Sequence, residues 1–264
     1  MKNTILSRLP ASYPWRGNIH YFDTIDSTNT RAKQMAFEGA PHGTVLIADA
    51  QTGGRGRMGR SFHSPAGSGI YLSMILRPGC PAKELLHLTC AVAVATSDGI
   101  HAATGLRPKI KWTNDLVVGQ KKLGGILTEL SLGNSGNVDF AVVGIGINCS
   151  QTVGDFPADI QSIATSVHLV TGKAIDRASV IAQILVALQK MSENLQNSVA
   201  TLSRYRQDCI TIGKEISLIR GDEIRHGKAL DVDETGALMV QFTDGQTQAV
   251  QSGEVSVRGM YGYV

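Results

Sequence analysis

The sequence predicts an α+β protein in which a larger helix-and-strand domain is followed by a small C-terminal barrel. Up to about residue 210, apolar segments of period two alternate with segments of helical period. After that residue, only short period-two segments with tight turns follow. Hydrophobic residues make up 42% and charged residues 18% of the 264 residues, which is typical of a globular protein and not of a disordered one. We therefore expect two domains, residues 1–210 and 211–264.

The first part of the chain predicts three strands and one helix. Residues 1–18 fit either a short helix or an irregular arm, and we expect no helix-turn-helix domain in so short a segment. Residues 19–25 alternate and predict a strand. A polar cluster then caps a helix over residues 28–38, which a glycine and a proline end. Apolar residues 44–48 and 70–76 predict two further strands.

The next part predicts a long helix, a hairpin, a buried strand and a helical stretch. Apolar spacing over residues 82–103 predicts a buried helix. Residues 109–118 predict one strand that pairs with residues 121–130 across a glycine turn. Residues 138–148 predict a buried strand, and residues 177–208 an amphipathic helix with a short break near residues 196–198. The barrel strands are predicted at residues 214–219, 224–232, 237–242, 247–251 and 254–258.

The totals argue against several classes of protein. The net charge of +3 does not by itself demand nucleic acid as a partner. The four cysteines form no CxxC or CxxH pair, which argues against a zinc site or a disulfide framework. No apolar segment is long enough to cross a membrane, and the N-terminus lacks the pattern of a signal peptide. We expect a cytoplasmic protein that makes no membrane contact.

The stretch richest in chemical information is residues 51–60, Gln-Thr-Gly-Gly-Arg-Gly-Arg-Met-Gly-Arg, between two predicted strands. Glycines allow the backbone to approach a ligand closely, and arginines donate to phosphate or carboxylate through a forked, permanently charged group. The stretch therefore predicts a site for a phosphate-bearing ligand. A solvated basic loop without a ligand is the alternative that composition leaves open.

The predicted hairpin adds polar groups of the same kind. Its first strand, residues 109–118, carries two lysines, an asparagine and an aspartate on its polar side. Its second strand contains the pair Gly124 and Gly125, which suggests that a ligand or another backbone lies close there. The buried strand at 138–148 contains two glycines as well and ends in an asparagine.

Five blocks, in order, resemble biotin protein ligases. The three signature blocks are Gly-Arg-Gly-Arg-Met-Gly-Arg at 54–60, Lys-Trp-Thr-Asn-Asp at 111–115 and Lys-Lys-Leu-Gly-Gly-Ile-Leu at 121–127. The supporting blocks are Asp-Ser-Thr-Asn at 26–29 and Gly-Ile-Gly-Ile-Asn at 144–148. The resemblance extends over nearly the whole chain from about residue 19. It departs from the family at Thr113, where proline is usual, and at Met58, where a further basic residue is frequent.

The resemblance implies a mixed sheet with flanking helices, like the catalytic domain of class II aminoacyl-tRNA synthetases, and an SH3-like C-terminal barrel. It implies that ATP and Mg²⁺ activate biotin to biotinyl-5′-AMP, and that biotin then passes to a lysine of the biotin carboxyl carrier domain of a carboxylase. It also implies a form without the DNA-binding domain, so we expect no DNA partner. A homodimer is compatible with the sequence, which leaves the oligomeric state open.

The resemblance and the residue types together predict three overlapping sets of site residues and no protein-held metal. The predicted catalytic set is Arg57, Lys111, Asp115 and Lys122. The predicted biotin-binding set is Ser27, Thr28, Asn29, Gln51, Arg55, Gly56, Arg57, Lys122 and Gly125. The predicted ATP and adenylate set is Arg55, Arg57, Arg60, Lys111, Trp112, Asn114 and Asn148. Gly125, Gly144 and Gly146 are expected to let the backbone lie against the ligand.

The sequence leaves more than one interpretation open. Ser27, Thr28 and Asn29 are also what a helix N-cap requires, and Trp112 is equally suited to the core of the sheet. A lipoate–protein ligase uses the same acyl-adenylate chemistry. A biotinyl-AMP-sensing regulator without ligase activity and an inactive adenylate-binding module are also compatible with a basic loop of this kind. The arginine loop and the Lys-Trp-Thr-Asn-Asp block favour the biotin ligase.

Overall fold

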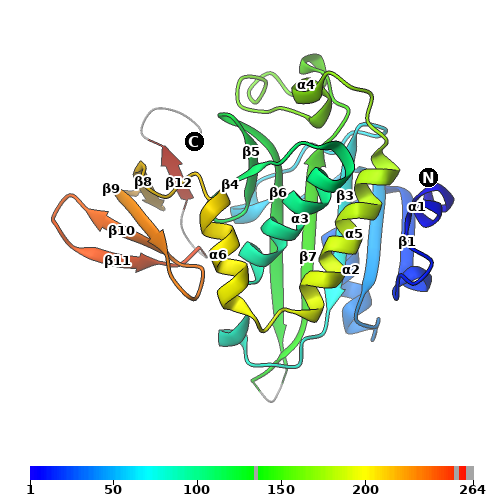
Figure 1. The fold of residues 1–264 in the computed structure, drawn as a ribbon, viewed down its shortest axis with the longest axis horizontal. Helices are drawn as coiled ribbons and strands as arrows, with labels where there is room; N and C mark the ends of the chain where they lie inside the picture. The colour runs from blue at the N-terminus through cyan, green and yellow to red at the C-terminus, as the bar shows by residue number, and fades with distance from the viewer. Residues whose placement is uncertain (134–135, 253–255, 260–264) are drawn as a thin grey trace.

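A seven-stranded mixed sheet forms the centre of the larger domain (Figure 1). The computed structural model describes residues 1–133, 136–252 and 256–259. The strand order is β1-β2-β3-β7-β6-β5-β4, with β1 and β2 parallel and all other neighbours antiparallel. The strands span Ile19–Ile25 (β1), Thr44–Gln51 (β2), Gly69–Leu76 (β3), Lys109–Lys111 (β4), Asp115–Val118 (β5), Lys121–Leu132 (β6) and Val138–Asn148 (β7). The mixed sheet implied by the resemblance is confirmed.

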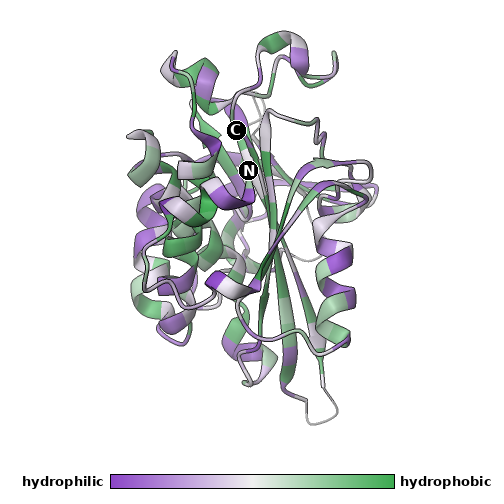
Figure 2. Ribbon diagram, turned by 90° about the vertical axis from the view of Figure 1, so that its right-hand side faces the viewer, coloured by the Kyte–Doolittle hydropathy of each residue, from purple (hydrophilic) through white to green (hydrophobic). Residues whose placement is uncertain are grey.

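Helices cover both faces of this sheet, as the edge-on view in Figure 2 shows. The helices span Lys2–Arg8 (α1), Thr28–Phe37 (α2), Leu88–Thr104 (α3), Val167–Thr171 (α4), Arg177–Glu193 (α5) and Ser198–Asp208 (α6). Helices α3 and α5 pack on one face in the main core, and α2 packs on the other in a smaller one. Because β3 is covered on both faces, all its residues are buried, and its sequence is apolar apart from Ser73 instead of alternating.

Local sequence signals explain where the helices begin and end. The Ser27 hydroxyl accepts from the Thr30 amide and caps α2, which joins the parallel strands β1 and β2 as a crossover. Helix α3 ends before Gly105, whose φ of 77° is a conformation that glycine readily adopts. The predicted start at residue 82 differs, because residues 82–85 form a separate 3₁₀ turn. The break in the helical stretch at 177–208 is confirmed at residues 194–197.

The prediction of one strand over residues 109–118 is wrong. The chain reverses at residues 112–114, so β4 and β5 pair with each other in antiparallel fashion, with Lys111 opposite Asp115. The peptide bond between Trp112 and Thr113 is cis. The alternating pattern had hidden this reversal because each arm of the hairpin is itself extended. The Lys-Trp-Thr-Asn-Asp block therefore forms the bend of a tight hairpin at the edge of the sheet.

The C-terminal residues form a second, antiparallel sheet that lies beside α6 in Figure 1. Its order is β11-β10-β9-β8-β12. The strands span Glu215–Arg220 (β8), Glu223–Val232 (β9), Leu238–Phe242 (β10), Thr247–Val250 (β11) and Ser256–Gly259 (β12). These are the five strands predicted for the small barrel, although residues 254 and 255 of the last prediction lie outside the described residues. Among the described residues, no helix has the length and apolarity needed to cross a bilayer.

Candidate active site

A cavity of about 560 Å³ brings the sequence blocks together. Every residue predicted for catalysis or for biotin binding lines it, and so does every residue of the predicted ATP set except Asn148. The lining comes from the cap of α2, the end of β2, the glycine–arginine loop, the β4–β5 hairpin and strands β6 and β7. Segments of the chain from Ser27 to Arg258 thus face one space.

Lys122 and Asp115 form an ion pair at the wall of this cavity. The Lys122 ammonium lies 2.6 Å from Oδ1 of Asp115, and the two side chains are 31% and 17% exposed. Asp115 is paired with Gly125 across β5 and β6. A Cβ at Gly125 would lie 3.3 Å from the Lys122 ammonium, so glycine keeps the space around that group free. The site therefore holds a lysine at the cavity wall beside a carboxylate.

Arg57 connects three parts of the molecule. Its guanidinium donates to Oδ1 of Asn114 at 2.9 Å and to the carbonyl oxygen of Ser252 from the C-terminal domain. Asn114 in turn donates to the carbonyl oxygen of Ile126 at 3.0 Å. Burial lowers the pKa of Arg57, an effect that nearby Asp115 opposes, and a guanidinium stays charged at neutral pH. Arg57 thus places the positive charge of the glycine–arginine loop beside the β4–β5 hairpin.

Lys111 is a buried cation in the same cavity. The residue is only 6% exposed, and it lies at the end of β4. Burial, together with the nearby charges of Lys122, Arg258 and Arg60, lowers the pKa of Lys111 to about 8. Asp115 acts in the opposite direction, because its negative charge favours the charged ammonium. An anionic ligand would favour the charged ammonium, so this lysine is suited to bind phosphate or carboxylate.

A continuous hydrogen-bond network connects three of the lining residues, Thr28, Asn29 and Gln51. The backbone amide and the hydroxyl of Thr28 both donate to Oε1 of Gln51, at 2.8 and 3.0 Å. Gln51 donates to the hydroxyl of Ser64 at 3.0 Å. The Ser73 hydroxyl lies 2.8 Å from that of Thr28 and 2.6 Å from Oδ1 of Asn29. Helix capping is therefore only part of the role of this block, because just Ser27 caps α2.

Asn29 is held by its neighbours on both sides of its amide group. Its Nδ2 donates to Oε2 of Glu129 at 3.0 Å and to the carbonyl oxygen of Leu127 at 3.3 Å. Burial raises the pKa of Glu129, but hydrogen bonds from Asn29 and Lys33 outweigh burial and lower it. Glu129 is therefore ionised at neutral pH, and it orients the amide of Asn29.

Gly144 leaves the space that Asn29 occupies, which leads to a prediction. A Cβ at Gly144 would lie 2.0 Å from Oδ1 of Asn29. We expect Gly144→Ala to lower the free energy of unfolding by about 1–3 kcal/mol, since the clash displaces a buried hydrogen-bonded group. Urea denaturation measures the effect. Gly154→Ala is the matched control, because no atom lies within 4 Å of its new Cβ. Equal stability of the two variants would contradict the prediction.

The remaining predicted residues have different surroundings. Trp112 is 4% exposed, lies in the main core and donates from Nε1 to the carbonyl oxygen of Gly236, yet it also lines the cavity. Trp112 is thus a core residue that also borders the cavity, and its contact with a ligand stays a prediction. Asn148 is not among the lining residues, and its Nδ2 donates to the carbonyl oxygen of Thr165 at 3.0 Å. Gly146 faces the ring of Phe62, whose nearest atom would lie 2.7 Å from an added Cβ.

Some residues that line the cavity were not predicted from the sequence as site residues. These residues are mostly apolar ones from buried strands and loops, together with one arginine of the C-terminal domain: Met58, Phe62, Leu72, Ile126, Leu127, Ile145, Ile163, Val257 and Arg258. An apolar residue that faces a cavity has the same sequence pattern as one that faces the core, so no local signal distinguishes them. Arg258 lies in a strand far along the chain, where an arginine is an ordinary surface residue.

The comparisons with known proteins agree with this geometry. Residues 21–148 match the biotin/lipoate A/B protein ligase family, and residues 211–258 match the biotin protein ligase C terminal domain. The bifunctional ligase/repressor BirA of Bacillus subtilis is 38% identical over 227 residues, which are 85% of this chain and 70% of that protein. The biotin–[acetyl-CoA-carboxylase] ligase of Mycobacterium tuberculosis is 31% identical over 236 residues, which cover 87% and 85% of the two chains.

A solved structure of a biotin protein ligase has the same fold as this chain. The biotin protein ligase from Aquifex aeolicus in complex with biotin and ATP superposes with a TM-score of 0.78 and 31% identity, covering 92% of this chain and 99% of that one. Sequence identity above 30% over most of both chains, together with the shared fold, is more than a fold-level likeness. The chain belongs to the biotin protein ligase family.

Proposed function

We propose that this protein is a ligase that activates biotin with ATP and transfers it to a lysine of a biotin carboxyl carrier domain. The observation that carries the proposal is the convergence of the glycine–arginine loop, the β4–β5 hairpin and β6 on one cavity. Cationic side chains from all three, namely Arg57, Lys111 and Lys122, line it together. Biotin and ATP are both anionic, and they have to be brought together in the first step.

In the first half-reaction, the biotin carboxylate oxygen attacks the α-phosphorus of ATP, and the bond to the β-phosphate oxygen breaks, which releases pyrophosphate. Negative charge increases on the α-phosphoryl oxygens as the new bond forms, so preorganised cations lower the barrier. We assign this role to Arg57, Lys111 and Lys122. The Thr28–Gln51 network offers donors and acceptors for the ureido ring, in a cavity with apolar walls.

In the second half-reaction, the amine of the target lysine attacks the acyl carbon of biotinyl-AMP, and AMP leaves. The amine has to lose a proton in this step. Asp115 is the one acidic side chain that lines the cavity among the described residues. It lies in an ion pair with Lys122, and we propose that it accepts this proton.

Magnesium fits the site as a partner of the nucleotide. Mg²⁺ is usually held by one or two carboxylates together with substrate phosphates, and the cavity offers the carboxylate of Asp115. When bound, the ion would neutralise charge on the pyrophosphate leaving group. No group of three or more His, Cys, Asp or Glu side chains in the described ranges could hold a metal by itself.

Lys111 predicts how nucleotide affinity depends on pH. Its pKa of about 8 means that the ammonium loses its charge as the pH rises above that value in the ligand-free protein. A bound phosphate favours the charged form, so ATP binding should take up a proton and weaken as the pH rises from 7 to 9. Calorimetry in buffers of different ionisation enthalpy measures the uptake. Lys111→Arg keeps its charge over this range, and a pH slope that persists in that variant would assign the effect to another group.

The same linkage applies to stability, with a defined sign. Between about pH 8 and the ordinary lysine value, the unfolded chain binds more protons at this residue than the folded protein does. The contribution of Lys111 therefore makes the protein more stable as the pH rises through that window. Below pH 8 both states carry the proton, and burial of the charge is a constant cost.

The assignment is tested by offering purified protein ATP, Mg²⁺ and labelled biotin, first without and then with a carrier domain. Biotin-dependent exchange of pyrophosphate into ATP and label on one carrier lysine are expected. Exchange with lipoate in place of biotin would identify the lipoate ligase instead. Pyrophosphate exchange with biotin, but without transfer of biotin to any carrier domain, would favour the biotinyl-AMP-sensing regulator without ligase activity.

Three further proposals concern organisation and partners. We keep the division into domains at residue 210, which agrees with the start of the match to the C-terminal domain at residue 211. A mobility-shift titration with DNA at low and high salt tests the expectation that DNA is not a partner. Sedimentation with and without biotin and ATP tests whether the protein forms a homodimer.

A further inference from the structure

Residues 205–211, hereafter the connector, bind the β4–β5 hairpin through hydrogen bonds and one ion pair. They comprise the end of α6 and the short segment that leads to the C-terminal sheet. The Ile210 amide donates to the carbonyl oxygen of Ile110 at 2.9 Å. The Trp112 amide donates to the hydroxyl of Thr211, also at 2.9 Å. These contacts place the connector alongside β4 and its bend.

Two side chains of the connector complete this contact. The hydroxyl of Tyr205 donates to the carbonyl oxygen of Thr113 at 3.1 Å, and Tyr205 is fully buried. The carboxylate of Asp208 accepts from the Lys109 ammonium at 2.7 Å, and its side chain is only 4% exposed. Hairpin residues 109, 110, 112 and 113 therefore each bind the connector, whereas residues 111, 112, 114 and 115 line the cavity.

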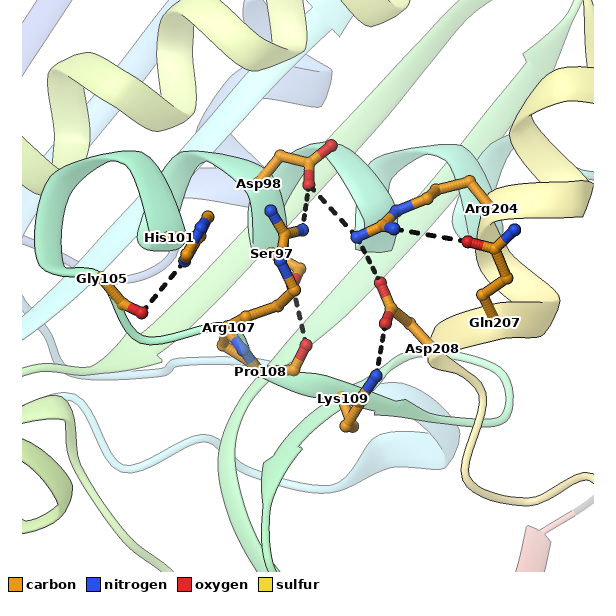
Figure 3. Close-up of polar contacts among 10 residues, drawn as sticks. All are labelled: Ser97, Asp98, His101, Gly105, Arg107, Pro108, Lys109, Arg204, Gln207 and Asp208. Carbon is orange, nitrogen blue, oxygen red and sulfur yellow. Dashed lines mark hydrogen bonds and ion pairs between the residues drawn. The ribbon is translucent and has the colours of Figure 1, made fainter.

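Asp208 is itself held in place by a set of ion pairs, which Figure 3 shows. Arg204, one turn earlier on α6, lies 2.9 Å from Oδ2 of Asp208 and 3.8 Å from Oδ1 of Asp98 on α3. Asp98 also pairs with Arg107, which precedes β4. The connector is thus anchored to α3 on one side while it binds the hairpin on the other.

The connector is also attached to the C-terminal sheet. Arg206 donates to the carbonyl oxygen of Val232 at 2.7 Å, and it lies 3.2 Å from the carboxylate of Asp231. Trp112 reaches the same domain through its indole, which donates to the carbonyl oxygen of Gly236 at 3.0 Å. The hairpin therefore lines the cavity and is also bound to the connector and to the C-terminal sheet.

We propose that the connector positions the hairpin for nucleotide binding, with Thr211 and Tyr205 as positioning residues that do not touch substrate. This inference rests on the proposed function, in which the hairpin supplies contacts to ATP. Each hydrogen bond favours the binding-competent arrangement of the hairpin over others. Loss of one lowers the population of that arrangement, and the apparent affinity falls by the same factor.

The expected effect is confined to one substrate. Strand β4 is at one edge of the sheet, whereas β1 and β2, which flank the Thr28–Gln51 network, are at the opposite end of the strand order. A change in the connector should therefore raise the KM for ATP and leave the KM for biotin within about twofold. Thr211→Val leaves the buried Trp112 amide without its acceptor, so we expect a rise in the KM for ATP of about tenfold.

The test measures adenylate formation for the wild type, Thr211→Val, Thr211→Ser and Thr96→Val. Thr211→Ser retains the hydroxyl and should restore the KM for ATP to within about twofold of wild type. Thr96→Val is the matched control, since its buried hydroxyl donates within α3, to the carbonyl oxygen of Val92. A wild-type KM for ATP in Thr211→Val, or equal rises in the KM for ATP and for biotin, would overturn the proposal.

Two further measurements keep the proposal testable if Thr211→Val does not fold. Tyr205→Phe removes only the hydroxyl that binds Thr113, and we expect it to raise the KM for ATP about threefold. The chain has two tryptophans, so in a Trp15→Phe background Trp112 alone reports on the hairpin. Acrylamide quenching of Trp112 should increase in Tyr205→Phe. Unchanged quenching together with an unchanged KM would refute the inference, whereas a wild type that never forms an adenylate would refute the proposed function.

Discussion

Lys122→Ala is expected to slow the formation of biotinyl-AMP by about two to three orders of magnitude, the effect of removing one preorganised charge from a developing negative centre. The Lys122 ammonium is one of the cations that line the cavity, and it lies 2.6 Å from Asp115. Without it, the Asp115 carboxylate faces the cavity with less opposing charge and repels both anionic substrates. The lost attraction between Lys122 and the substrates and the added repulsion from Asp115 therefore both slow adenylate formation.

The neighbouring lysine supplies the control for this experiment. Lys121 is exposed, precedes Lys122 on β6 and does not line the cavity, because successive side chains of a strand point to opposite sides. Lys121→Ala should retain the wild-type rate in single-turnover measurements of the adenylate. Lys122→Arg keeps the charge on a differently shaped group and should fall between the two. Comparable rates for Lys122→Ala and Lys121→Ala would remove Lys122 from the site.

Arg57→Gly should make biotinyl-AMP dissociate about ten to a hundred times faster, since hydrogen bonds to a charged group are stronger than neutral ones. The guanidinium joins the loop to Asn114 and to the carbonyl oxygen of Ser252, so its loss both removes charge and frees the loop from two neighbouring segments. Folding should be little affected, because Arg57 is only partly buried and lies outside the main strands.

The release rate is measured by chasing labelled adenylate with an excess of unlabelled compound. Arg57→Ala separates the loss of the side chain from the added backbone freedom of glycine, and it should release nearly as fast if the guanidinium is responsible. Arg57→Lys should give an intermediate rate because it keeps the charge without the fork. Wild-type release from Arg57→Ala would show that loop flexibility, and not the guanidinium, controls the lifetime of the adenylate.

Most secondary structure could be predicted because its signals are local. Strand β3 is apolar apart from Ser73, α2 begins at a serine cap, and α3 ends at a glycine. The glycine–arginine loop was also evident, since its composition is unusual over ten consecutive residues. The hairpin at 109–118 was missed because alternation continues across a bend when each arm is extended.

The orientation of individual site side chains depends on tertiary packing more than on local sequence signals. Asn148 is the last residue of β7, a strand whose residues 144–146 line the cavity, but its side chain turns to Thr165. Asn29 was expected to face the ligand, and its amide is largely occupied by Ser73 and Glu129. Hydrogen-bond partners that are 17 to 100 residues away leave no trace in the local pattern.

The sequence by itself therefore determined which residues could carry the chemistry: three arginines in a glycine-rich loop, a lysine-rich hairpin and a lysine beside paired glycines. Only the tertiary structure decided that Arg57 donates a hydrogen bond to Asn114 and that Lys122 forms an ion pair with Asp115. It also decided that Tyr205 and Thr211 form hydrogen bonds with the β4–β5 hairpin. The physical reason is that composition and periodicity report on the nearest turns of chain. Contacts between distant segments are set by how the sheet and its helices pack as a whole.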